Sequence, residues 1–272
     1  MATDPFAFGK NWRAFVDKYL NAERITEARQ SLVAFTKGYD FRGKRFVDIG
    51  CGSGLFSLCA HRLGADVTSF DVDPDSVACC QFLREQEGRP ENWRVLHGSV
   101  LDEAFVRELG QFDFVYSWGV LHHTGEMWRA IENASNMVES GGSFYLAIYN
   151  KADGFAFYDD GRFGPSSLWL REKMIYSSLP PLAQAAVDYA VMGAMIALYA
   201  VTLQNPVKKI RNHKALRGMS WRIDIKDWLG GYPYEYASVA EIFAFLEPRG
   251  FTLKNLISTN GLRNNEFLFV RG

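Results

Sequence analysis

The sequence predicts an α/β fold with a doubly wound, mostly parallel sheet. From residue 45 onward, short apolar segments of strand length alternate with segments of helical periodicity. The first apolar segment, 45–49, runs directly into a turn that carries Gly50, Gly52 and Gly54. The second ends at Asp71, which is 21 residues after Gly50. Ligands bind at the carboxyl ends of strands in such sheets, so both features fall where a binding site is expected.

The length and composition fit one large domain, or a core domain with a cap. The chain has 272 residues, of which 48% are hydrophobic, so it can bury a sizeable core. Its 30 basic and 31 acidic side chains give a net charge of −1. This balance provides no electrostatic footprint for nucleic acid, and we expect no nucleic-acid partner.

The cysteines indicate neither a metal site nor a disulfide framework. Cys51, Cys59, Cys79 and Cys80 include no CxxC pair and have no histidines at zinc-ligand spacing. We therefore expect no metal, and we interpret the four thiols as small buried groups in a reducing compartment. The first residues lack the charged and apolar regions of a signal peptide, which favours a cytoplasmic location.

The core is predicted over residues 41–150 and follows an N-terminal helical cap, residues 1–40. Apolar residues at helical spacing predict two helices between residues 9 and 37. The first core strand begins at Arg45, and Gly64 ends the helix that follows it. Asp73 and Pro74 are typical of the start of the next helix. Later strands are predicted at 67–70, 93–97, 112–118 and 143–149, and a helix with Met127, Ile131, Ala134 and Val138 on one face precedes the last of them.

The spacing of the glycines separates two classes of cofactor. Dinucleotide-binding turns follow the pattern GxGxxG, whereas here the third glycine comes one residue early and Leu55 follows it. The pattern GxGxG, preceded by Asp48 in the strand, resembles the first motif of the Rossmann-like S-adenosylmethionine-dependent methyltransferases. The alternative is a tight turn without a ligand.

The resemblance implies S-adenosyl-L-methionine as cofactor and S-adenosyl-L-homocysteine as product. The cofactor-binding residues that it implies first are those of the turn itself: Asp48, Gly50, Cys51, Gly52 and Gly54. A carboxylate at Asp71 can accept hydrogen bonds from the two hydroxyls of a ribose, although nicotinamide enzymes use the same device. An exposed turn acid is the alternative.

The adenine end of the predicted site is less well defined. In the methyltransferases an acid often follows the third strand, but here Ser99 occupies that position and Asp102 comes three residues later. We therefore expect contacts from Ser99, from the Val100 backbone amide and from Val72.

The fourth strand and its loop resemble the family motif that faces the methyl donor. The run 112–124 contains Trp118, a predicted cofactor contact, and then His122 and His123. A hydroxyl or thiol acceptor needs a base, so one of these histidines is the candidate catalytic residue; packing against the backbone is the alternative role. The Trp-Ala-Asn-Val-Gly-Gly-Phe-Leu pattern that closes this unit is similar to methyltransferases of ubiquinone biosynthesis, and the resemblance covers residues 41–150.

Residues 237–272 are predicted to complete the sheet. Ser238 with Glu241 three residues later forms a capping-box pattern at the start of a helix that ends at Gly250. Two strands then follow, at 251–258 and 266–270. The family resemblance implies a closing hairpin, which gives a seven-stranded sheet with an antiparallel last strand.

An aromatic-rich insertion, residues 151–236, separates the core from this final part. It leaves the fifth strand near the predicted methyl-donor side, so it is placed to cap the substrate, although it also fits a small core of its own. Aromatic walls suit an apolar or aromatic small-molecule acceptor. The candidate acceptor-binding residues are Tyr149 and Asn150 at the end of the fifth strand, Asp227 and Glu235 in the stretch 227–235, which is interpreted as a loop, and Arg222 shortly before it.

Residues 182–203 of the insertion are almost wholly apolar and precede the basic run 208–217. Asp188 interrupts the apolar segment and leaves it short of a convincing membrane span. We favour a buried helix or a helix that forms a homodimer. Membrane contact through residues 182–217 is the less favoured alternative.

These observations favour methyl transfer from S-adenosylmethionine to a small molecule, most simply to oxygen. Transfer to nitrogen or sulfur is the nearest alternative. A nicotinamide-dependent oxidoreductase, a silent cofactor-binding module and a nucleic-acid or protein methyltransferase are further alternatives. The early third glycine disfavours the first of these three. The segment Ser117–Trp118–Gly119–Val120 replaces the Asn-Pro-Pro-Tyr motif that a base-modifying enzyme would carry.

Overall fold

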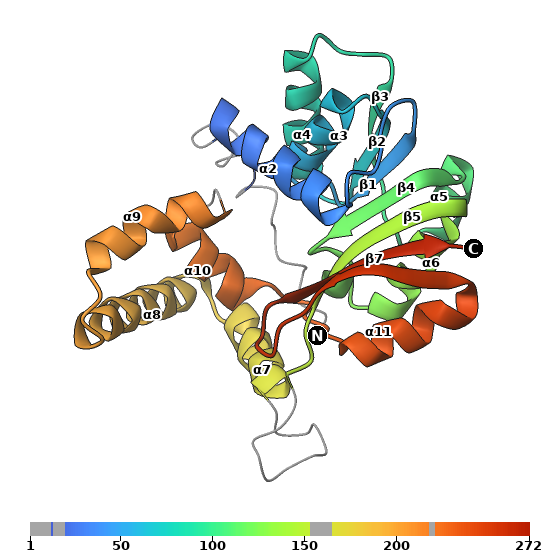
Figure 1. Cartoon of the computed structure of the whole chain (residues 1–272). Coiled ribbons are helices and arrows are strands. Elements are labelled where there is room, and N and C mark those ends of the chain that lie inside the picture. The colour runs from blue at the N-terminus through green and yellow to red at the C-terminus, as the bar shows by residue number, and fades with distance from the viewer. Residues whose placement is uncertain (1–11, 13–19, 153–164, 218–220) are drawn as a thin grey trace.

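The computed structural model describes residue 12 and residues 20–152, 165–217 and 221–272. Seven strands form one sheet in the order β3-β2-β1-β4-β5-β7-β6, which confirms the predicted fold class (Figure 1). Strands β1 to β5 pair in parallel, and β7 lies antiparallel between β5 and β6. The strands are β1 (Arg45–Ile49), β2 (Asp66–Asp71), β3 (Trp93–His97), β4 (Phe112–Trp118), β5 (Val138–Tyr149), β6 (Phe251–Ile257) and β7 (Asn264–Arg271).

Helices cover both faces of the sheet and form a lobe beside it (Figure 1). Those of the sheet domain are α2 (Ala22–Phe35), α3 (Leu55–Arg62), α4 (Pro74–Gln86), α5 (Glu103–Leu109), α6 (Met127–Asn136) and α11 (Val239–Leu246), with short 3₁₀ turns η1 (Leu121–His123) and η2 (Glu247–Arg249). Those of the lobe are α7 (Pro165–Ser178), α8 (Pro181–Val201), α9 (Pro206–Arg217) and α10 (Trp221–Gly230).

Local capping explains where the core helices begin. The Asp73 carboxylate accepts a hydrogen bond from the Asp75 backbone N–H at 2.9 Å, and Pro74 is the first residue of α4. The predicted capping box at Ser238 and Glu241 is present in α11. These predictions are confirmed because the interactions involve residues only two or three positions apart.

Two details of the core differ from the prediction. Helix α5 was not expected, and the Asp102 side chain caps it through the N–H groups of Ala104 and Phe105. Val138 was expected on a helix but belongs to β5, where the register against β4 shifts between Phe112 and Phe114. Such an irregularity lets the strand begin several residues before the glycine pair 141–142.

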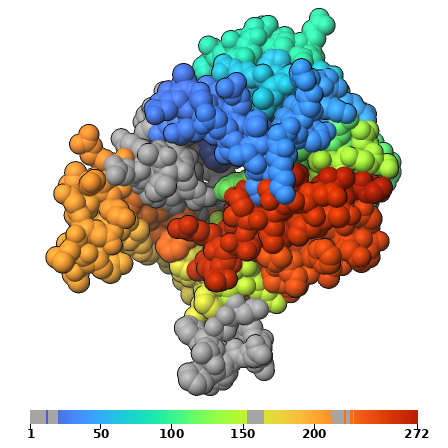
Figure 2. All heavy atoms as spheres, in the orientation of Figure 1, coloured from blue at the N-terminus to red at the C-terminus, as the bar shows by residue number. Residues whose placement is uncertain are grey.

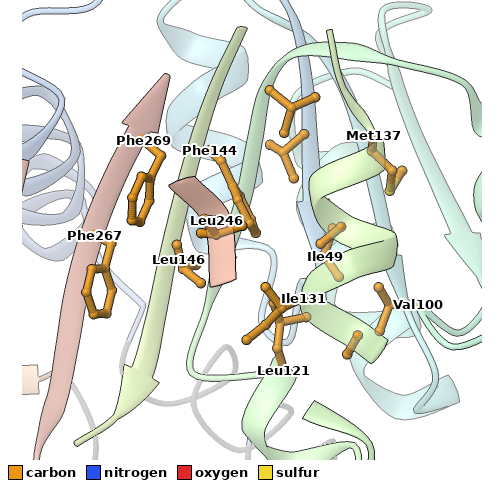
Figure 3. Close-up of a cluster of buried hydrophobic side chains, with 14 of the residues drawn as sticks. Ile49, Val100, Leu121, Ile131, Met137, Phe144, Leu146, Leu246, Phe267 and Phe269 are labelled. Atoms are coloured by element: carbon orange, nitrogen blue, oxygen red, sulfur yellow. The ribbon is translucent and has the colours of Figure 1, made fainter. Parts of the chain in front are cut away.

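The two faces of the sheet carry separate apolar clusters. Along β1 successive side chains point to opposite faces, so Phe46 joins one cluster and Val47 the other. The first cluster packs under α2, α3 and α4. The second packs under α5, α6 and α11, and Figure 3 shows part of it. The labelled residues of that view are Ile49, Val100, Leu121, Ile131, Met137, Phe144, Leu146, Leu246, Phe267 and Phe269.

The insertion forms a helical lobe with a small core of its own. Trp221, Ile225 and Leu229, each one helical turn apart on α10, pack with Tyr176 of α7 and Met192 of α8. The expectation of a loop at Asp227 is therefore wrong, because that residue lies within α10. The core helix expected near Ser238 is α11, so the lobe occupies the chain between β5 and α11 (Figure 1).

The apolar segment 182–203 is helical, as predicted, but it is not a buried helix. Only Asp188 and Met192 of α8 are buried, and the rest of its surface faces outward or is half-covered. Among the residues that the structure describes, α8 is the one helix whose length and composition would suffice to cross a bilayer.

At the N-terminal end, α2 confirms the second predicted cap helix. Ala28, Leu32 and Phe35 are buried against the cluster under α3 and α4, as their spacing predicts. The first predicted cap helix lies outside the described residues, apart from Trp12.

Candidate cofactor and acceptor site

The glycine turn, Asp71 and the histidine pair lie at the carboxyl ends of β1, β2 and β4. In Figure 1 the arrowhead of β7 points away from the helical lobe, and β5 runs antiparallel to it, so the carboxyl ends of β1 to β5 face the lobe side. The glycine turn follows β1, Asp71 ends β2, and the histidine pair follows β4. This edge is where open α/β sheets bind their ligands.

The glycine turn adopts a backbone conformation that other residues rarely reach. Gly50, Gly52 and Gly54 have φ angles of 71°, 51° and 78°. A Cβ added to Gly54 would lie 2.9 Å from both the Cα and the Sγ of Cys80 on α4. Positive φ and close packing against α4 therefore require glycine at position 54, and the turn leads directly into α3.

Two of these glycines also bring other segments against the turn. A Cβ on Gly50 would meet the side chain of Val120 at 2.4 Å, and one on Gly52 would meet the indole Nε1 of Trp12 at 2.9 Å. The loop after β4 and the N-terminal cap therefore both contact the turn after β1. At both glycines, protein atoms occupy the space in which a Cβ atom would lie.

Asp71 is fixed in place by backbone donors. Its Oδ2 accepts a hydrogen bond from the Gly52 N–H at 3.0 Å, and its Oδ1 accepts one from the Asp73 N–H at 2.9 Å. Burial raises the pKa of this carboxyl, while the two backbone donors oppose that shift. Each carboxylate oxygen keeps further acceptor capacity, so the side chain is held rigidly and can still accept from a ligand hydroxyl.

Asp48 lies beneath the turn, in a buried chain of hydrogen bonds. Its Oδ2 accepts from the Ser57 hydroxyl at 2.5 Å, Ser57 accepts from Ser69 at 2.7 Å, and the Trp93 indole N–H donates to Ser69 at 2.9 Å. Burial raises the pKa of Asp48 to about 7. The carboxyl thus links β1 to α3, β2 and β3, and it supports the turn from below.

Cys51 is buried under the same turn and interacts with the Cys80 thiol. The hydrogen bond with Cys80, together with burial, raises the pKa of Cys51 well above its usual value. The four cysteines of the chain are free and buried, as predicted. A neutral, buried thiol at this position is a packing group, and its backbone remains the part that can face a ligand.

The residues predicted to contact adenine differ in how far their side chains are exposed. Val72 is an exposed apolar side chain at the tip of β2, directly beside Asp71, so it can offer a surface to a base. Ser99 is half-buried, and Val100 is buried in the core under α6. Asp102 is engaged in capping α5 and is not arranged as an adenine ligand.

Trp118 at the end of β4 and Trp12 are both half-buried against the cluster under α3 and α4. Trp118 is therefore at the tip of the strand, as predicted. Sequence reasoning had placed Trp12 only on a cap helix. Its contact with Gly52 adds an indole to the boundary of the cofactor site.

The histidine pair is packed rather than exposed. His122 is fully buried, and neither of its ring nitrogens has a hydrogen-bond partner within the described residues. Nδ1 of His123 donates to the Pro233 carbonyl oxygen at 2.6 Å. Burial lowers the pKa of His122 well below its ordinary value and that of His123 to about 4, and the charge of Lys173 adds to both shifts. Both imidazoles are thus neutral at pH 7.

Aromatic rings and one buried cation surround this pair. The Tyr149 ring centroid lies 4.2 Å from that of His122 and 5.0 Å from that of Tyr234. The ammonium of Lys173, on α7, lies 5.3 Å from the centroid of the Tyr234 ring and donates to the Trp228 carbonyl oxygen. We call Tyr149, His122, His123, Tyr234 and Lys173 the junction cluster, because it joins the strand ends to the lobe.

Sequence reasoning did not find Lys173. Two of its partners, the Trp228 carbonyl oxygen and the Tyr234 ring, are 55 or more positions away, so no local pattern relates them to it. The one local sign was a lysine on the face of α7 that also carries Trp169 and Tyr176, which are one helical turn to either side.

Two predicted acceptor-binding residues make structural contacts. The Asn150 amide donates to the Gly261 carbonyl and accepts from Asn265, which ties β5 to the hairpin of β6 and β7. Glu235 accepts a hydrogen bond from the Met127 N–H at 2.9 Å, at the start of α6. Burial raises the pKa of Glu235, and the backbone donors at α6 lower it. Both side chains hold segments that border the junction cluster.

Arg222 and Asp227 both lie on α10, in the lobe, and their side chains are outside the described part of the structure. Their predicted contact with an acceptor therefore stays a prediction. No cluster of metal-binding side chains is present among the described residues.

Comparison with known proteins agrees with this geometry. A methyltransferase domain family matches residues 20–216 of the chain. Curated relatives include the ubiquinone biosynthesis O-methyltransferase of Xanthomonas axonopodis pv. citri, which is 29% identical over 109 residues. The enzyme of the same name from a Methylobacterium strain is 33% identical over 109 residues. These alignments cover 40% of this chain and 44% and 42% of the two relatives, so the chain spans less than half the length of the curated relatives that it matches.

Solved structures extend the similarity to the whole fold. Magnesium protoporphyrin IX methyltransferase from Synechocystis PCC 6803, with bound SAH, superposes with a TM-score of 0.55 at 15% identity and covers 97% of this chain and 94% of that one. An O-methyltransferase family protein from Burkholderia thailandensis gives 0.57 at 13% identity, with 100% and 65% covered. At these identities the likeness concerns the fold. Because the family match extends over more than two thirds of the residues and the sheet order and glycine turn agree with it, the chain belongs to the methyltransferase domain family.

Proposed function

We propose that this protein transfers a methyl group from S-adenosyl-L-methionine to a small-molecule acceptor, most simply to an oxygen atom. One observation carries the proposal. The Asp71 carboxylate is held at the carboxyl end of β2 by the N–H of Gly52, in the glycine turn, and by the N–H of Asp73. A nucleoside across these strand tips would place its ribose hydroxyls at a carboxylate that is already oriented.

Each predicted cofactor residue has a place in this arrangement. Asp71 accepts from the ribose, Val72 packs against the adenine, and the Val100 backbone and Ser99 border the base. The turn with Gly50, Gly52 and Gly54 receives the amino-acid tail, while Asp48 and Cys51 keep the turn in shape from below. Trp118 borders the methyl side. These remaining roles follow the sequence prediction and are part of the proposal.

The bound cofactor supplies a sulfonium-activated methyl group, so this chain must position the acceptor and exclude water. Holding two reactants in line can lower a barrier by roughly 7–11 kcal/mol at best. The junction cluster provides an aromatic wall at the ends of β4 and β5. Such a wall favours an apolar or aromatic acceptor.

Within the cluster, His123 suits the role of base better than His122. Its Nδ1–H donates to the Pro233 carbonyl, which fixes the orientation of the ring, and its side chain is half-buried whereas that of His122 is fully buried. His122 is enclosed by Tyr149 and His123 and acts as a packing group beside it. Arg222 and Asp227 are kept as acceptor contacts from the lobe, and Tyr149 as a lining residue.

Calorimetry tests the cofactor assignment directly. We expect S-adenosylmethionine to bind and a nicotinamide dinucleotide not to bind. Asp71→Asn should weaken binding by roughly tenfold or more, because one charged hydrogen-bond partner is lost. The matched control is Asp66→Asn at the opposite end of β2, where the exposed carboxylate only contacts Asn92, and this variant should bind normally. An unchanged affinity for S-adenosylmethionine in Asp71→Asn would contradict the proposed role of this carboxylate.

Acceptor specificity is tested with a panel of phenols, aliphatic alcohols, amines and thiols and a methyl-labelled cofactor. We expect labelled product from apolar phenols first. The curated relatives named above are O-methyltransferases of ubiquinone biosynthesis, which supports starting with oxygen acceptors. Product from amines or thiols alone would favour the nitrogen or sulfur alternative.

The wider assignments rest on the sequence and stay proposals. We keep the division into a cap (1–40), a core (41–150), an insertion (151–236) and a closing segment (237–272). The four free cysteines agree with a reducing compartment such as the cytoplasm. A homodimer is proposed on the same footing, and its test is the solution mass.

A further inference from the structure

Helix α8 leaves an apolar surface uncovered. Of its described 21 residues only two are buried, although 18 consecutive positions are apolar enough to pass as a membrane span. Leu182 is 87% exposed, Val201 is 80% exposed, and Leu203, in the turn after the helix, is 96% exposed. Monomeric proteins rarely leave contiguous surfaces of this kind open to water.

Most of the exposed large apolar side chains of the described residues belong to the lobe. On α8 and the turn after it they are Leu182, Tyr189, Ile196, Leu198, Val201 and Leu203, and Val207 continues them on α9. Figure 2 shows this part of the lobe standing at one side of the molecule, away from the sheet domain. The surface is therefore accessible to a large flat partner.

No charge interrupts this surface. Asp188, the single charged residue between Pro181 and Leu203, is buried and accepts a hydrogen bond from the Tyr176 hydroxyl at 2.7 Å. That bond, and the packing of Met192 against α10, holds the opposite face of α8 to the lobe. The helix therefore lies along the lobe surface with one face packed against the lobe and the other face free of Asp, Glu, Lys, Arg and His side chains.

A basic helix follows directly. Between Asp188 and Asp224 the sequence has no acidic residue and six basic ones. Lys208, Lys209 and Arg211 at the start of α9 are exposed, and an open pocket of about 420 Å³ at this corner is lined by Asn205, Val207, Lys208 and Arg211. The pocket places two cations at the N-terminus of a helix and beside an exposed valine, an environment that favours a phosphate.

We propose that α8 and the first turns of α9 dock the protein on an anionic lipid bilayer. The outer face of α8 enters the boundary between headgroups and acyl chains, and Lys208, Lys209 and Arg211 contact lipid phosphates. Since the inner face of α8 is held by α7 and α10, the helix lies in the interface plane and does not cross the membrane. This inference does not depend on the identity of the methyl acceptor.

Charge complementarity favours lipid over a second copy of the chain. Two α8 helices could cover each other, but the uniformly basic segment that follows would find no acidic counterpart on the described outer faces of α8 and α9. A bilayer with anionic headgroups can cover the apolar face of α8 and neutralise the basic residues of α9 at the same time. Each Lys or Arg near such a surface contributes about fivefold in affinity at low salt.

Vesicle co-sedimentation of the full chain tests the proposal. We expect binding to vesicles of phosphatidylglycerol and phosphatidylcholine in equal parts, and little binding to phosphatidylcholine alone. The double variant Lys208→Gln/Lys209→Gln should weaken binding by roughly 25-fold at low salt. The double variant Val201→Gln/Leu203→Gln should weaken it by roughly tenfold or more.

Matched controls lie on the sheet domain. Lys254→Gln and Ile257→Gln change an exposed cation and an exposed apolar side chain on β6, and they should bind like the wild type. Thermal melting checks that every variant is folded, and a polarity-sensitive dye attached at Leu203→Cys should shift to the blue on binding. Absence of binding to anionic vesicles overturns the proposal. The proposal is also overturned if sedimentation equilibrium shows a dimer, and if Val201→Gln/Leu203→Gln dissociates this dimer without changing vesicle binding.

Discussion

The sheet domain and the helical lobe use apolar residues in opposite ways. In α6, six of the ten residues are buried, whereas α8, which is twice as long and more hydrophobic, buries two. The core helices bury one face against the sheet and expose a polar one, as amphipathic helices do. Helix α8 has no polar outer face. Among the described residues, the sheet domain therefore covers the apolar faces of its helices, whereas the lobe leaves the outer face of α8 exposed.

A matched pair of isoleucines gives the largest expected effect. Ile131 on α6 is fully buried, and Ile131→Ala should cost about 3 kcal/mol of unfolding free energy, from lost transfer energy and a cavity. Ile196 on α8 is 40% exposed, and Ile196→Ala should cost less than about 1 kcal/mol. Urea unfolding of both variants measures the contrast. Equal costs would mean that the outer face of α8 is covered in solution.

Alanine substitutions at two glycines of the sheet domain distinguish the cost of a steric clash from the cost of backbone strain. Gly54 and Gly250 have φ angles of 78° and 84°, but an added Cβ meets Cys80 at 2.9 Å in the first and nothing within 4 Å in the second. We expect Gly250→Ala to cost about 1 kcal/mol from strain and Gly54→Ala about 3 kcal/mol. Urea unfolding measures the loss of stability in each variant. Similar losses would show that α4 moves to accommodate the added methyl group.

The buried Asp48 makes the stability of the sheet domain depend on pH. Its pKa is about 7 in the folded chain and near 3.8 when exposed, so between these values the native state binds a proton that the unfolded state has released. Stability therefore falls as the pH rises from about 4 to about 7, by on the order of 3 kcal/mol.

Asp48→Asn should remove this slope and still accept from Ser57. Unfolding free energies of the wild type and the variant at several pH values provide the test. Parallel curves would show that Asp48 does not carry the proton.

The smallest effect concerns the junction between the two regions. The positive charge of Lys173, on the lobe, helps to lower the pKa of His123 to about 4. Lys173→Met keeps most of the side-chain volume and removes the charge, so the pKa of His123 should rise. Histidine proton resonances followed by NMR titration measure it. An unchanged value would show that burial alone sets the shift and that the lobe does not influence the histidines electrostatically.

The sheet domain was predictable because its determinants are local. The strands at 93–97 and 112–118 have the expected bounds, and the caps at Asp73 and Ser238 involve residues within three positions of each other. The short helix α5 escaped notice because seven residues give little periodicity. The predicted cofactor side rests on local patterns of the same kind, namely the glycine turn and the acid that ends β2.

The acceptor side was harder to predict, because its contacts join distant positions. Glu235 and Asn150 stay predicted acceptor contacts. Their side chains also hold α6 and the β6–β7 hairpin across more than 100 residues of sequence, and this role was not predicted. The stretch near Asp227 was interpreted as a loop because turn residues follow it. The helical spacing of Trp221, Ile225 and Leu229 was present in the sequence and determined the outcome.

One contact at the strand tips limits how the protein can change. The isopropyl group of Val120 fills the volume that a side chain at Gly50 would need. The loop after β4 therefore packs closely against the turn after β1 at this position. A side chain at position 50 would therefore displace the loop after β4, so the shape of this loop depends on the glycine in the turn after β1.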